Sequence, residues 1–168
     1  SSGGGSLLVN PNGGSDSNIT LGSLTTTASG GSFVVGRATS SGTGTLTITA
    51  TTDKDATGIY GGRVVFANGT ANTGYDWATT GTSSPGPYVL SDYSGYTALD
   101  TTTVGPLSDS NNSRVTAGAI LPATSSRTTN SLKFENPAAA SNLDLGAGNT
   151  LTLKSGGLLI TGDRKSTR

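Results

Sequence analysis

The densest group of charged side chains that could do chemistry is Asp53-Lys54-Asp55, followed after a Gly-containing turn by Arg63. Carboxylates can hold a calcium ion, and a nearby Arg or Lys can serve as the base of a polysaccharide lyase. The alternative is a solvated loop tip whose Lys lies between two carboxylates. Sequence spacing leaves both readings open, so we assign no catalytic residue and no metal ligand from this group.

A second set of carboxylates lies in the middle of the chain, where a pair could supply the acid and base of glycoside hydrolysis. Its members are Asp76, Asp92, Asp100 and Asp109. Their spacing fixes no geometry. The chain has no Cys and no His, which excludes Ser-His-Asp and Cys-His catalysis and the common zinc sites. We expect no enzyme activity and no cofactor, with a polysaccharide lyase or hydrolase as the alternative.

Aromatic residues are the better candidates for binding. A chain otherwise poor in aromatic side chains gathers five of them within 22 residues: Tyr75, Trp77, Tyr88, Tyr93 and Tyr96. Such rings offer a large contact area at a small entropy cost, so they could line a sugar-binding face or a protein contact. The alternative is that they pack a small lobe against the rest of the fold.

The elements that must position these residues are short strands. Gly (26), Ser (23) and Thr (29) together make 78 of the 168 residues, a composition that disfavours helices. Apolar residues nevertheless alternate with polar ones at period two, which is typical of half-buried strands. The alternating pairs are Ile19 and Leu21, Phe33 and Val35, Leu46 and Ile48, Val64 and Phe66, Leu132 and Phe134, Leu143 and Leu145, and Leu151 and Leu153. We predict an all-β fold.

The last part of the chain restarts such strands every eight to eleven positions. The segments are NSLKF (130–134), NLDLG (142–146), NTLTL (149–153) and GLLITG (157–162), separated by Gly, Asn and Ser. Closely spaced strands with a corner after each are what a coiling β-solenoid needs, at roughly 20 to 27 residues a turn. Gly residues such as Gly156 would make the corners, and Asn residues before strands, such as Asn130, Asn142 and Asn149, could stack as amide ladders or simply favour turns.

The chain divides into three parts. Strands in residues 1–67 are more loosely spaced, near 7–9, 19–24, 33–35, 46–49 and 63–66. Residues 68–113 lose the alternation and hold most of the Tyr residues, Trp77 and three of the six Pro, so we expect an irregular central excursion. Regular strands return in 114–162.

The run NSLKFENPAAASNLDLGAGNTLTLKSGGLLITG, from Asn130 to Gly162, resembles the repeat of autotransporter passengers and autotransporter-associated β-strand proteins. GYDWATTG at 74–81 and SGYTAL at 94–99 resemble segments of the same large secreted proteins. The resemblance implies a single-stranded right-handed parallel β-helix and a structural segment of a bacterial secreted or cell-surface protein, a stalk or adhesin scaffold. It supplies no catalytic residues. The alternative functions are a carbohydrate-binding module and a polysaccharide-active β-helix enzyme.

The same resemblance places the chain outside the cell or on a bacterial surface, with surface glycans or host and cell-surface proteins as possible partners. The tail at 163–168, DRKSTR, holds three of the ten basic residues and looks like a translated sequencing adapter; the alternative is a natural basic tail. We therefore expect a solenoid over 1–162 that continues into further coils of a parent protein. Because the net charge is near zero, we expect no nucleic-acid binding. Because no long apolar run is present, we expect no membrane insertion by this segment.

Overall fold

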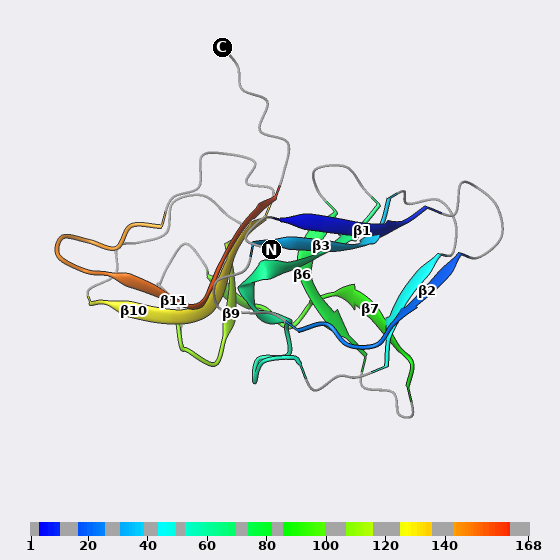
Figure 1. The fold of residues 1–168 in the computed structure, drawn as a ribbon. Coiled ribbons are helices and arrows are strands. Elements are labelled where there is room, and N and C mark those ends of the chain that lie inside the picture. The colour runs from blue at the N-terminus through cyan, green and yellow to red at the C-terminus, as the bar shows by residue number, and fades with distance from the viewer. Residues whose placement is uncertain are drawn as a thin grey trace, which may run out of the picture. The chain divides into compact units, whose positions relative to one another are not determined.

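The computed structural model describes residues 4–10, 17–25, 31–38, 44–49, 53–69, 74–81, 86–99, 107–115, 125–135 and 143–161. These residues form an all-β fold with no α-helix, as Figure 1 shows, and the sequence prediction of this class is confirmed. The chain divides into two compact units, residues 1–94 and 95–168, and each unit is described by itself.

The first unit is built on one seven-stranded sheet that curves until it is nearly closed. Its strand order is β1-β3-β5-β6-β7-β4-β2. A short 3-10 helix, Gly61–Arg63, precedes β5. The strands are β1 (Gly5–Val9), β2 (Asn18–Leu21), β3 (Phe33–Arg37), β4 (Thr45–Ile48), β5 (Val64–Asn68), β6 (Tyr75–Thr80) and β7 (Tyr88–Asp92).

Strand direction changes within this sheet. β1, β3 and β5 pair in parallel, with Gly5 opposite Phe33 and Phe33 opposite Val64. β2 and β4 also pair in parallel. β6 pairs antiparallel with both β5 and β7, and β7 pairs antiparallel with β4. The sheet is therefore mixed, and the expectation of a uniformly parallel solenoid is not confirmed for this unit.

The period-two pattern decides which side chains enter the core of the first unit. Val35, Leu46, Ile48, Val64 and Phe66 are all buried in one cluster, whereas the alternate residues Val34 on β3 and Val65 on β5 are only half-buried. The alternating pairs of residues 1–67 thus predicted the inward positions correctly. Because strands at opposite ends of the order line the same interior, the curved sheet acts as both walls of the core.

Gly36 permits the close approach of β3 and β5. Its φ is +130°, and a Cβ at this position would lie 2.2 Å from the backbone oxygen of Ala67. No side chain fits there, so the glycine is a packing requirement of the parallel pair.

The second unit contains a four-stranded, entirely parallel sheet. Its strands follow the chain order: β8 (Thr97–Leu99), β9 (Asn112–Val115), β10 (Arg127–Glu135) and β11 (Leu151–Thr161). Thr97 stands opposite Ser113, and Ser131 opposite Gly157. A small core of Leu99, Val115 and Leu132 lies on one face.

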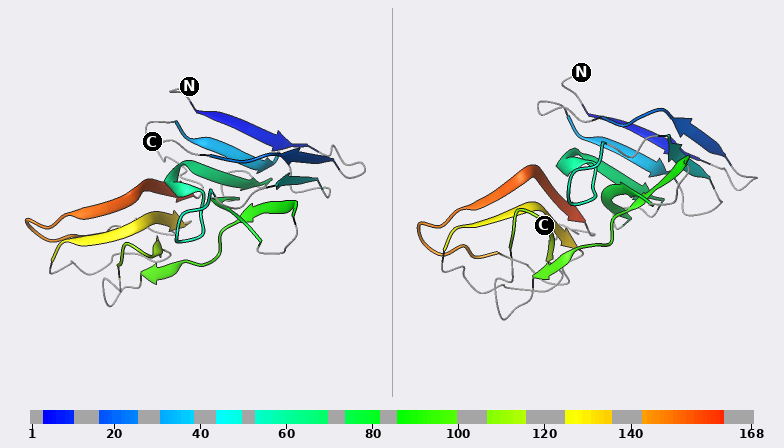
Figure 2. Two further views of the ribbon diagram at one scale, coloured as in Figure 1. Left: turned by 60° about the horizontal axis from the view of Figure 1, so that its bottom comes forward. Right: turned by 90° about the horizontal axis from the view of Figure 1, so that it is seen from below.

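β10 and β11 each bend near the middle, which Figure 2 shows most clearly in its right-hand view. At the bend Asn130 of β10 stands opposite three residues of β11, Lys154 to Gly156, so the register shifts there. Gly156 has a φ of +72°, a conformation that side chains rarely adopt. The hydroxyl of Ser155 donates to the carbonyl of Asn130 at 2.7 Å and satisfies an acceptor that the bulge removes from the ladder.

Several boundaries differ from those predicted from sequence. NTLTL and GLLITG join into the single strand β11, because Gly156 bends the strand without ending it. The described part of NLDLG holds one bridge residue, Leu143, and no strand. The central segment 68–113 contains regular strands, β6 to β8 and the first half of β9. The expected tail at 163–168 lies outside the described residues.

Candidate functional site

The five aromatic residues that the sequence suggested do not form one exposed platform. Trp77, on β6, is buried with 1% of its surface exposed. Tyr96 belongs to the second unit, whereas the other four belong to the first. The set is therefore divided between the two units, and its largest ring is unavailable to a ligand.

The remaining tyrosines are half-buried. Tyr75 begins β6, and Tyr88 begins β7 and packs against the core of the first unit. Tyr93 follows β7, and its backbone N–H donates to the carbonyl of Trp77 at 2.9 Å. Three rings with partly exposed surface thus remain on the β6 and β7 segment, where a binding role stays a prediction.

The charged group at 53–55 is tied into the fold of the first unit. Asp53 accepts from the backbone N–H of Leu24 at 3.2 Å, and the Lys54 ammonium donates to the carbonyl of Thr80 at 3.1 Å. Asp55 accepts from the N–H and the hydroxyl of Thr57, at 2.9 and 2.6 Å, and so closes its own turn. Each side chain has a structural partner, which differs from both the calcium site and the solvated tip considered from sequence.

The three described carboxylates of the middle segment each have surroundings of their own. Asp76 accepts from the backbone N–H of Trp77 at 2.8 Å, and Asp109 pairs with Lys154 at 3.3 Å in the second unit. Asp92 ends β7, and Asp100 lies outside the described residues. Across the described ranges, no group of three His, Cys, Asp or Glu side chains is placed to hold a metal ion.

Tyr60 is a buried titratable residue of the first unit whose surroundings shift its pKa. Its side chain is fully buried beside the core. Burial raises the pKa of the phenol above its usual value of 10.0, the Thr80 hydroxyl lowers it, and the charge of Asp53 raises it further. The net direction is upward, so the neutral phenol is strongly preferred.

The second unit holds a partly buried charge cluster on the face opposite its apolar core. Glu135 accepts from Arg114 at 3.0 Å and from Lys133 at 3.2 Å. Both cations also lie over the ring of Tyr96, at 5.5 and 5.4 Å from its centroid. Lys133 is only 1% exposed, so these contacts compensate a buried ammonium and give the cluster a structural role.

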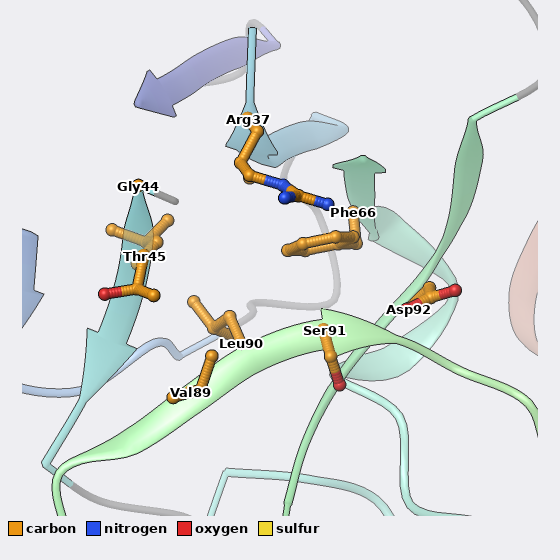
Figure 3. A pocket seen from close by; sticks show the side chains of 10 residues that line it. Arg37, Gly44, Thr45, Phe66, Val89, Leu90, Ser91 and Asp92 are labelled. Atoms are coloured by element: carbon orange, nitrogen blue, oxygen red, sulfur yellow. The ribbon is translucent and has the colours of Figure 1, made fainter. Parts of the chain in front are cut away.

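A cavity of about 360 Å³ opens inside the curved sheet of the first unit. It lies where the end of β3, the start of β4, the middle of β5 and the end of β7 face one another. Figure 3 shows Arg37 extending from β3 over the ring of Phe66, with Leu90 directed into the same space. The volume falls within the range of small-molecule pockets.

Arg37 was not among the candidate residues taken from the sequence. The search for chemistry followed clusters of charge, and Arg37 stands alone between apolar residues and Gly-rich segments. The available signal was the alternation itself: Phe33 and Val35 face the core, so the next residue at period two, Arg37, faces the same interior.

Comparison of the chain with protein-family models, curated proteins and solved structures found no match. None of the helical segments in the described ranges is long and apolar enough to cross a membrane.

Proposed function

We propose that the chain is a structural β-solenoid segment of a large bacterial secreted or cell-surface protein, similar to autotransporter passengers, and that it serves as a stalk or adhesin scaffold. The resemblance of residues 130–162 to passenger repeats motivates the proposal. Its single strongest support in the structure is the stacking of consecutive parallel strands in the second unit.

In the described part of that unit, β9, β10 and β11 each pair in parallel with the strand that precedes them in the chain. Ser113 lies opposite Leu132, and Leu132 opposite Leu158, so like positions stack at separations of 19 and 26 residues. A chain that returns to the same face after each turn of this length is coiling. In such a coil, the long bent strands β10 and β11 would each cover two faces.

The outer edge of β11 supports continuation into a further coil. Leu158 and Ile160 pair with Leu132 and Phe134, which contact the apolar core, yet they are 53% and 51% exposed. Their side chains share the core face, but no described strand covers them from the far side. A further parallel strand of the same kind would bury both and satisfy the unpaired edge of β11.

The test is a tandem chain in which residues 136–161 are repeated directly after Thr161. This segment spans the 26 positions that separate Leu132 from Leu158, so the repeated residues 157–161 should pair with residues 157–161 of β11, as residues 131–135 of β10 do. We expect the backbone N–H groups of β11 to gain protection from hydrogen exchange and the unfolding free energy to rise by about 1–3 kcal/mol.

The matched control carries the same 26 residues in scrambled order, which keeps composition and length. Equal protection of β11 in both chains, or none in either, would contradict the coiling proposal.

The scaffold role is tested separately from the architecture. A scaffold predicts no selective binding on a glycan array, whereas a carbohydrate-binding module predicts selective binding that falls when Tyr75, Tyr88 and Tyr93 are changed to Ala. Selective binding with that dependence would replace the scaffold proposal by its carbohydrate-binding alternative.

A further inference from the structure

The guanidinium of Arg37 faces the cavity inside the first unit. Arg37 continues the inward series of Phe33 and Val35, and its register neighbour on β1 is the buried Val9. Within the described part of the chain it makes no side-chain hydrogen bond and no ion pair. A guanidinium is always charged and carries five N–H donors, so the half-buried Arg37 has donors available for an anionic ligand.

The surroundings of Arg37 in the cavity are mainly apolar. Phe66, Leu46 and Leu90 belong to the buried core cluster and also line the cavity. The opening is flanked by Val89, which is 48% exposed. An occupant that fills this space must therefore present an apolar body next to the group that meets Arg37.

One carboxylate limits the charge of the occupant. Asp92 lines the cavity at the end of β7, is exposed, and forms no ion pair within the described ranges. A single cation opposed by a nearby carboxylate favours a ligand with one negative charge over a phosphate with two.

We propose that this cavity binds a small organic acid, with its carboxylate on the Arg37 guanidinium and its aromatic or aliphatic body against Phe66, Leu46 and Leu90. The planar fork of Arg matches a carboxylate with two parallel hydrogen bonds. The site uses only the first unit and does not depend on the solenoid proposal.

The test is an NMR titration of the full chain with phenylpropionate, followed at the backbone N–H groups of Gly36, Leu46 and Ser91, which line the cavity. Phenylpropanol has the same apolar body without the charge, and inorganic phosphate has charge without the body. We expect saturable binding of phenylpropionate, with phenylpropanol at least about tenfold weaker and no saturation by phosphate.

Substitutions of Arg37 and Asp92 test whether their two charges determine the affinity for phenylpropionate. Arg37→Met keeps the stem and removes the charge, and it should weaken phenylpropionate binding by about tenfold or more. Asp92→Asn should tighten binding a few-fold because it removes a like charge from the rim. Lys154→Gln removes a cation from the exposed pair with Asp109 in the second unit and should change nothing.

Three results would overturn the proposal: equal binding of the acid and the alcohol, undiminished binding by a folded Arg37→Met variant, or the absence of saturation at these three amides. If Arg37→Met fails to fold, Asp92→Asn still decides, because weaker or unchanged binding of the acid in that exposed-residue variant contradicts the charge arrangement.

Discussion

The side-chain amide of Asn130 donates a hydrogen bond to the side-chain oxygen of Asn112, with 2.9 Å between the two atoms. The same oxygen accepts from the hydroxyl of Ser131 at 2.8 Å. Both Asn residues are buried, and they come from the neighbouring strands β9 and β10. The amides therefore connect successive strands at the bend, where the backbone ladder is irregular.

Changing Asn112 to Ala should cost more stability than changing Asn130 to Ala. Loss of Asn112 leaves two buried donors, from Asn130 and Ser131, without their acceptor. We expect a loss of about 2–4 kcal/mol for Asn112→Ala and about 1–2 kcal/mol for Asn130→Ala. Urea unfolding monitored by circular dichroism measures both values.

Asn18→Ala is the control for that pair, because Asn18 is exposed and accepts only at the surface, from the Thr45 hydroxyl. Its expected cost is below about 0.5 kcal/mol. Equal losses at all three positions would show that the buried amide contact is not a stabilising link.

Gly36→Ala should prevent folding of the first unit or destabilise it by more than about 3 kcal/mol. The added Cβ would collide with the Ala67 backbone at 2.2 Å, and the φ of +130° is unfavourable for Ala. Thermal unfolding measures the stability of Gly36→Ala and of the control variant Gly81→Ala. Gly81 has open space around it, so its substitution should be tolerated; a tolerated Gly36→Ala would place β3 and β5 farther apart than described.

The buried charge cluster of the second unit should respond asymmetrically to substitution. Glu135→Gln leaves the buried Lys133 ammonium and Arg114 without their shared carboxylate, and we expect a loss of about 1–3 kcal/mol, moderated by the partial exposure of Glu135. Lys133→Met removes the buried charge itself and should cost less. Chemical denaturation ranks the two variants, and a larger loss for Lys133→Met would contradict this account of the cluster.

Tyr60 should make the first unit sensitive to alkaline pH. Because burial raises its folded pKa above 10.0, the unfolded chain releases the phenolic proton first. The stability contribution of the neutral phenol is complete below the unfolded pKa and is lost as the pH rises toward the higher folded pKa. Tyr60→Phe cannot ionise, so its stability should fall less between about pH 9 and pH 11. Urea unfolding midpoints of the unchanged chain and of Tyr60→Phe at both pH values test this. An equal decrease of the midpoint in the two proteins would refute it.

The sequence predicted which residues face inward better than how the strands pair. Phe33, Val35, Leu46 and Ile48 were placed correctly because alternation depends only on local spacing. Alternation carries no information on strand direction, so the antiparallel pairing of β6 and β7 could not be read from it. The same limit applies to the join within β11, where a Gly corner bends the strand instead of ending it.

Candidate site residues were predicted least well where the burial of a side chain does not follow from its residue type. Trp77 was considered as part of a binding surface, but its side chain on β6 is almost fully buried. Asn130 was noted as a residue that could stack, whereas its partner Asn112 carried no distinguishing signal in a chain rich in Asn. Arg37 could be identified only by extending the period-two alternation of Phe33 and Val35 by one more step.

The antiparallel pairing of β6 and β7 has a consequence for how strands can be added to the first unit. β6 occupies the free side of β5, β7 occupies the free side of β4, and the two pair with each other. Among the described strands of this sheet, only β1 and β2 then keep an unpaired edge. The β6–β7 hairpin thus closes one end of the parallel stack, and among the described strands of this sheet only β1 and β2 offer a free edge to another polypeptide.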